Sequence, residues 1–146
     1  MQTRRHFLQQ MELLAGGLVC TALPALSTGC VARIRYATPT LVGDRLAIRV
    51  AEVASGALLV EDPRADLPIY LRRTSAGEYT AVSTRCMHRG CQVEPVAEKL
   101  VCPCHGSEYT FAGDVLQGPT QHPLTRYRVT TDSDTVYIHV LPEGTS

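Results

Sequence analysis

Cysteine and histidine residues gather in two short boxes in the middle of this chain, and this feature constrains the fold more than any other. The first box reads CMHRGC over residues 86–91 and the second reads CPCHGS over residues 102–107. Disulfide frameworks usually spread cysteines along a small chain, whereas thiolates and imidazoles at short spacing are what a metal requires of its ligands. The chain is therefore expected to fold so that two loops meet around a metal site.

Each box supplies one thiolate and one imidazole, and two kinds of metal site fit this set. One is a closed tetrahedral zinc site with two cysteines and two histidines, in a structural interaction domain. The other is a 2Fe-2S cluster in which two cysteines hold one iron and two histidines hold the other. Zinc leaves the second cysteine of each box and the repetition of the box unexplained, so the residues favour the cluster.

The pattern C-x-H-x-G-C followed by C-x-C-H-G-S closely resembles the Rieske family. The resemblance extends from Thr40 to Leu141 and includes Gly118-Pro119, which resembles the proline loop that covers the cluster in this family. It implies a ligand set in which two cysteines hold the buried iron and two histidines hold the outer one. These residues are Cys86 and Cys102 for the buried iron, and His88 and His105 for the outer iron.

The resemblance also implies a disulfide between Cys91 and Cys104, as in the high-potential branch of the family. Ser107 and Tyr109 match positions at which the family places hydroxyls against cluster and cysteine sulfurs. Hydrogen bonds to sulfur stabilise the more negative reduced state. We therefore expect a potential in the upper half of the Rieske range of about −150 to +300 mV. The Rieske ferredoxins of aromatic-ring oxygenases resemble this chain in fold but usually lack these features.

The first 29 residues have the composition of an export signal. Arg4-Arg5 followed by Phe7-Leu8 resembles the twin-arginine (Tat) signal, and an apolar run follows. Residues 26–30 resemble a lipobox, which makes Cys30 a candidate for lipidation. We predict a signal over residues 1–29, a tether over residues 30–39 and the Rieske domain over residues 40–146. The protein is then expected in the periplasm, anchored to the membrane by a lipid or by its N-terminus.

Residues 40–146 predict an all-β fold, because short runs rich in Val, Ile, Tyr and Thr alternate with turn residues. The expected strands are 45–53, 57–60, 68–73, 79–83, 99–102, 108–111, 124–130 and 135–141. Residues 75–78 and 132–134 are predicted hairpin turns. This pattern indicates a small antiparallel sandwich or barrel that carries two cluster-binding loops.

Size and charge restrict the function. The chain has 146 residues, 14 basic and 14 acidic side chains, so it lacks the basic surface that nucleic acid requires. It is also too short to add the non-haem iron domain of an oxygenase.

We expect a one-electron carrier without a substrate pocket of its own, with a cytochrome or a quinol as partner. The alternative is the Rieske subunit of a quinol-cytochrome c oxidoreductase or of an arsenite-oxidase-type complex. Arg89 stands where Leu is commoner in the family, which disfavours insertion into a dry quinol pocket.

Overall fold

The structure is a computed structural model that describes residues 34–54 and 56–142. The predicted signal over residues 1–29 and the lipidation candidate Cys30 lie outside the described residues. Within the described part of the chain, no helix is long and apolar enough to span a membrane. The predicted all-β fold is confirmed, since α2 (Val50–Val53) is a single helical turn among strands.

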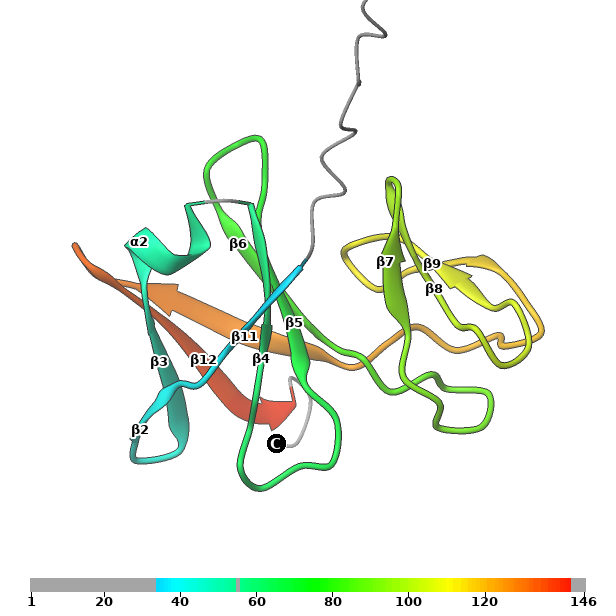
Figure 1. The fold of residues 1–146 in the computed structure, drawn as a ribbon, viewed down its shortest axis with the longest axis horizontal. Helices are drawn as coiled ribbons and strands as arrows, with labels where there is room; N and C mark the ends of the chain where they lie inside the picture. Colours follow the sequence, from blue (N-terminus) through cyan, green and yellow to red (C-terminus); the bar gives the residue numbers. More distant parts are fainter. Residues whose placement is uncertain (1–33, 55, 143–146) are drawn as a thin grey trace, which may run out of the picture. The chain divides into compact units, whose positions relative to one another are not determined.

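An eight-stranded sheet forms the larger part of the fold (Figure 1). Its strands follow the order β1-β4-β5-β6-β11-β12-β3-β2. They are β1 (Arg35–Ala37), β2 (Thr40–Val42), β3 (Arg45–Arg49), β4 (Ala57–Val60), β5 (Ile69–Arg73), β6 (Tyr79–Ser83), β11 (Arg126–Thr131) and β12 (Thr135–Pro142). Neighbours pair antiparallel except β1 and β4, which pair in parallel. Because β1 and β2 end this order yet adjoin in sequence, the sheet curls until its two ends meet.

A second, four-stranded antiparallel sheet carries the second box and is built from very short strands. Its order is β10-β9-β8-β7. The strands are β7 (Glu94–Val96), β8 (Lys99–Val101), β9 (Glu108–Tyr109) and β10 (Val115–Gln117). This small sheet lies between β6 and β11 in the sequence, so both boxes belong to one insertion into the larger sheet (Figure 1).

Strands β4 and β5 of the large sheet are apolar on both faces, so they contact both the main core and the small sheet. In β4 and β5, Leu58 and Leu71 enter the main core, whereas their neighbours Leu59 and Tyr70 enter a second core. Successive residues of a strand point to opposite faces. The second core also contains the side chains beneath the boxes, namely Cys86, Val93, Leu100, Cys102, Tyr109 and Leu124. The continuous apolar runs in β4 and β5 therefore reflect burial on both faces.

The last expected hairpin is present, as β11 and β12, and each of its strands alternates between a buried and a more exposed face. Tyr127 and Val129 of β11 pack against the main core, and Val136 and Ile138 of β12 are fully buried in it. The turn at residues 132–134 is also as predicted, with Asp132 Oδ1 accepting the backbone N–H hydrogen bonds of Asp134 and Thr135. The sequence pattern was sufficient here because each strand buries one face only.

Two expectations about strands are wrong in part. The strand expected over 45–53 ends at Arg49, because the Val50 N–H donates to the carbonyl of Asp134 and the chain turns into α2. The range 30–39, expected as a tether, contains β1, which pairs with β4 and buries Ala37. Three further strands of three residues each, β2, β7 and β10, were not expected.

Candidate metal centre

The two boxes form loops with the same backbone hydrogen bonds. In each loop the first cysteine donates its N–H to the carbonyl five residues later, and the glycine donates its N–H back to the first cysteine's carbonyl. These bonds are Cys86 N to Cys91 O at 2.8 Å, Gly90 N to Cys86 O at 2.8 Å, Cys102 N to Ser107 O at 2.8 Å and Gly106 N to Cys102 O at 3.0 Å. Both glycines have positive φ, 78° and 75°, which explains why the repeated pattern places glycine there.

The first cysteine of each loop has a free thiol buried in the second core. Cys86 is 2% exposed and Cys102 is 1% exposed. Burial acts to raise the pKa of Cys86, but hydrogen bonds from the Tyr109 hydroxyl and the His88 amide outweigh burial, so this pKa lies below its ordinary value. The pKa of Cys102 is raised, chiefly by burial. Two sulfur atoms are thus available as ligands away from solvent.

The rings of the two predicted histidine ligands lie against each other. The ring centroids of His88 and His105 are 4.8 Å apart, and the ring planes meet at 87°. The Nδ1 atom of His88 is buried and has no hydrogen-bond partner among the described residues. A buried polar nitrogen without a partner is costly unless a metal takes its lone pair. His105 is exposed, so one imidazole faces solvent while the other is sheltered.

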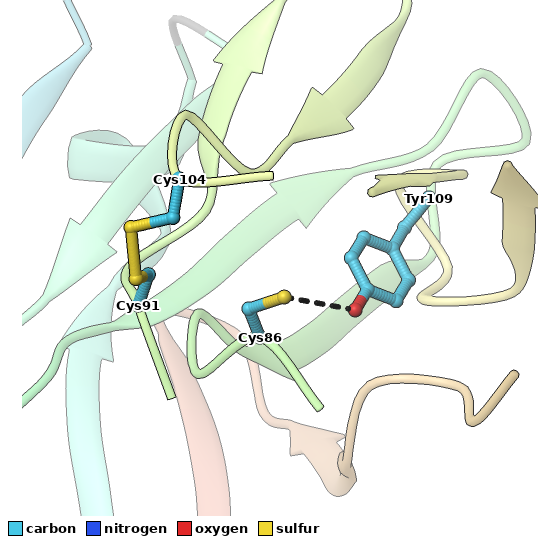
Figure 2. Close-up of a disulfide and its surroundings, with 4 residues drawn as sticks. All are labelled: Cys86, Cys91, Cys104 and Tyr109. Atoms are coloured by element: carbon cyan, nitrogen blue, oxygen red, sulfur yellow. Dashed lines mark hydrogen bonds between the residues drawn. A yellow bond between two sulfur atoms is a disulfide. The ribbon is translucent and has the colours of Figure 1, made fainter. Parts of the chain in front are cut away.

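A disulfide joins the two loops, as the resemblance implied. Cys91 of the first loop is bonded to Cys104 of the second (Figure 2). The sulfur atoms of this pair and of Cys102 lie within 4.8 Å of one another. That grouping by itself resembles a three-cysteine metal site, but cysteines joined in a disulfide offer no thiolate. The disulfide therefore removes one cysteine of each box from the set of candidate ligands.

Ser107, the last residue of the second box, and Tyr109, two residues later, are both fully buried. The Tyr109 hydroxyl lies 3.3 Å from the Cys86 sulfur (Figure 2). It also accepts a hydrogen bond from the backbone N–H of Met87 at 3.3 Å. Burial and the Cys86 contact raise the pKa of Tyr109 to about 12, so its hydroxyl keeps its proton and can donate it at neutral pH.

The predicted cover residues, Gly118 and Pro119, follow β10 and are exposed. The peptide bond between them is cis. The next residue, Thr120, is buried and donates its N–H to the Ser107 hydroxyl oxygen at 3.3 Å. Sequence reasoning missed Thr120. The only signal for it was a hydroxyl residue directly after Gly118-Pro119.

Three comparisons with known proteins agree on the family. The Rieske [2Fe-2S] domain model matches residues 45–128. The chain is 32% identical to the cytochrome b6-f complex iron-sulfur subunit of Chlorobaculum tepidum, a match that covers 94% of this chain and 75% of that subunit. It is 38% identical to the same subunit of Prochlorococcus marinus over 55% of this chain, and spans 47% of that relative's length.

Among solved structures, the fold is similar to the cyanobacterial plasma membrane Rieske protein of Synechocystis. The TM-score is 0.55 and the sequence identity is 32%, covering 62% of this chain and 93% of that one. Both boxes lie inside the matched family region, which decides against the zinc alternative. The chain therefore belongs to the Rieske [2Fe-2S] family, and it is an electron-transfer protein whose cofactor is a Rieske-type 2Fe-2S cluster.

Proposed function

We propose that this chain is a one-electron carrier of high reduction potential whose cluster is held by Cys86, Cys102, His88 and His105. The observation that carries the ligand assignment is the pairing of two free, buried thiols with two adjacent imidazole rings across two loops. The Nδ1 atom of His88 is buried and has no hydrogen-bond partner among the described residues. This atom supports the ligand assignment independently, because an iron ion would bind its lone pair.

The cluster, when bound, accepts and returns one electron at a time. Two neutral imidazoles in place of two thiolates make the centre less negative, so an added electron is stabilised more than in an all-cysteine cluster. His105 is exposed and His88 is partly buried, so the imidazole of His105 offers the shorter electron path to a partner docked on the loops. The chain thus needs a contact surface around His105 rather than a substrate pocket.

A high potential is supported by the polar groups around Cys86. The Tyr109 hydroxyl lies 3.3 Å from its sulfur, and the Tyr109 and Ser107 hydroxyls both act to lower the pKa of Cys86. Donors at sulfur favour the reduced, more negative cluster. The disulfide between the loops supports assignment to the high-potential branch that the sequence resembles.

The proposed partner is a cytochrome or another protein that accepts one electron. The names of the relatives, subunits of cytochrome b6-f complexes, support a partner of this type. Met87 is 43% exposed and Arg89 is exposed, both beside His88. Burying a guanidinium in a dry quinol pocket costs hydration free energy, so a hydrated protein interface fits this surface better than a quinol site.

A second candidate is a subunit of a quinol-cytochrome c oxidoreductase or of an arsenite-oxidase-type complex. The match across 94% of this chain to a cytochrome b6-f subunit favours the first of these. Affinity purification from membranes distinguishes the candidates. A subunit co-purifies with a b-type cytochrome or a molybdenum enzyme in fixed stoichiometry, whereas a separate carrier does not.

Export by the Tat system and anchoring through the N-terminus remain part of the proposal, supported by the sequence of residues 1–30 alone. Replacing Arg4 and Arg5 by Lys should retain the protein in the cytoplasm. Cys30→Ala should abolish incorporation of a labelled fatty acid if Cys30 is lipidated. Periplasmic protein from the Arg4→Lys, Arg5→Lys variant would contradict the Tat assignment.

The test of the main proposal is a redox titration of the intact purified chain, followed by electron paramagnetic resonance. We expect a rhombic spectrum with average g near 1.91, as the Rieske resemblance implies, and a midpoint above about +100 mV. A midpoint near about −150 mV would overturn the high-potential assignment while leaving the ligands in place. A colourless protein that contains zinc would overturn the cluster itself.

A further inference from the structure

A cavity lies where the edge strand of the small sheet approaches the large sheet. Its volume is about 600 Å³, within the range of about 300–1,000 Å³ in which proteins hold small ligands. Strands β4 and β5 supply one side of it, and β7 with the turn that follows supplies another. None of its lining residues belongs to either box, so the cavity is separate from the candidate metal centre.

Much of the cavity wall is apolar. Ile34, Ala57, Pro95 and Phe111 line it, and each of these side chains is only partly buried. An apolar group that enters the cavity removes their remaining apolar surface from water, which is favourable. The wall therefore favours a ligand with an apolar body.

One cationic side chain of this cavity, Arg72, forms no ion pair with the described residues. Its guanidinium lies 4.0 Å over the Phe111 ring. An aromatic ring attracts the cation, but it does not accept paired N–H hydrogen bonds as a carboxylate does. The guanidinium is thus held at the cavity with donors available to an anionic ligand.

Two other charged side chains line the cavity. Arg35 of β1 donates to the carbonyl oxygen of Glu52 at 2.7 Å. Glu98 is exposed in the turn between β7 and β8. The lining thus contains two guanidinium groups and one carboxylate, so a ligand with a single negative charge complements it.

We propose that this cavity binds a monomeric carboxylate with an apolar body. The carboxylate pairs with the Arg72 guanidinium, and the apolar body lies against Pro95 and Phe111. This inference goes beyond the proposed function, because it requires neither the cluster ligands nor a high potential. The competing explanation is that Arg72 only holds Phe111 against β5. Loss of the charge would then lower the free energy of unfolding without changing the affinity for any carboxylate.

Isothermal titration calorimetry of the intact purified chain with its cluster tests the chemistry of the ligand. Octanoate carries both a carboxylate and an apolar chain, whereas acetate has only the charge and octanol only the chain. We expect octanoate to bind at one site and more tightly than either of the other two. Absence of octanoate binding overturns the proposal, and so does an equal affinity for octanol or for acetate.

Substitution of Arg72 tests where octanoate binds. Arg72→Met keeps a long apolar side chain but removes the charge, so the affinity should fall about tenfold or more. Arg72→Lys keeps the charge without the paired donors and should lose less. Arg73→Met is the matched control, since Arg73 is the next residue of β5 and points to the opposite face. Wild-type affinity in Arg72→Met overturns the proposal.

A larger side chain at Ala57 tests the cavity from its apolar side. Ala57 is the cross-strand partner of Arg72, so Ala57→Leu occupies the space beside the guanidinium without removing the charge. We expect weaker octanoate binding and an unchanged Rieske spectrum, and undiminished binding contradicts the proposed site. If these variants do not fold, the comparison of octanoate with octanol on the wild type decides. A wild-type chain that binds octanoate but lacks a Rieske spectrum contradicts the proposed function alone.

Discussion

At Cys86 the protein surrounds one sulfur atom with hydrogen-bond donors while excluding water. Tyr109 and Ser107 both reach it, and both are fully buried. A hydrogen bond to a charged group contributes about 1.5–3 kcal/mol, which is a substantial fraction of the roughly 10 kcal/mol that separates the two ends of the Rieske potential range for one electron. Single side chains therefore decide much of the redox behaviour.

The first prediction concerns the Tyr109 hydroxyl. Tyr109→Phe removes one donor to Cys86 without emptying the core, so the reduction potential should fall, by on the order of 60 mV if the bond contributes about 1.5 kcal/mol. A redox titration measures this. Tyr137→Phe is the control, since its hydroxyl donates to Asp132 in the exposed hairpin turn. A potential unchanged in Tyr109→Phe would remove Tyr109 from the tuning set.

At the scale of the elements, a disulfide joins the two loops that carry the boxes. The loops come from separate segments, one after β6 and one between β8 and β9, and each has its own closing hydrogen bonds. The disulfide between Cys91 and Cys104 joins residues 13 apart in the sequence. Such a link restricts the unfolded chain and keeps the two halves of the site in register.

The second prediction is that Cys91→Ser with Cys104→Ser destabilises the site. A loop of this size predicts a loss of about 3 kcal/mol in the free energy of unfolding. The cluster should also bleach faster in urea, because the imidazoles are no longer held together. Urea titration followed by visible absorption measures both. Reduction of the wild type with a dithiol is the matched control, and bleaching at the wild-type rate in both cases would contradict the role given to the disulfide.

An aromatic stack adds to the contact between the two sheets. Tyr70 of β5 stacks on Phe111 with ring centroids 5.6 Å apart, and the Arg72 guanidinium lies 4.0 Å over the same Phe111 ring. Burial of Tyr70 raises its pKa to about 12, although the nearby Arg72 charge lowers it. The buried phenol therefore stays neutral where an unfolded tyrosine already ionises.

The third prediction follows from this pKa. Between pH 10 and pH 12 the unfolded state loses the Tyr70 proton while the folded state keeps it, so the free energy of unfolding falls as pH rises. Two pKa units correspond to a loss of up to about 2.7 kcal/mol. Tyr70→Phe should lose less stability over the same range, as measured by urea unfolding at each pH. Parallel curves for the two proteins would show that Tyr70 does not titrate as expected.

At the scale of the whole molecule, one core supports the large sheet and the other contains the candidate cysteine ligands. The main core contains only side chains of the large sheet and α2, whereas the second core contains both free thiols. Binding free energy of a metal group adds to the stability of the part that holds it. The large sheet should therefore keep its structure without iron, while the small sheet and the loops depend on it.

The fourth prediction tests this division. Removal of iron by a chelator under reducing conditions should raise hydrogen exchange at the backbone amides of the two boxes and of β8 and β9. The amides of β3 and β12 should stay protected, because the side chains that these strands bury lie in the main core, which contains no ligand. Hydrogen exchange with mass spectrometry, on the chain with and without iron, measures the difference. An equal loss of protection in both sheets would contradict the expectation that the large sheet keeps its structure without iron.

The sequence by itself determined the chemistry, because metal ligation depends on residue types at short spacing. The two boxes, their glycines and the one-sided hairpin of β11 and β12 were all readable from local pattern, and the all-β fold followed. Only the tertiary structure decided which strands are apolar on both faces, that β1 belongs to the sheet, and that the Thr120 N–H donates to the Ser107 hydroxyl. These depend on contacts between segments distant in sequence, which no local spacing encodes.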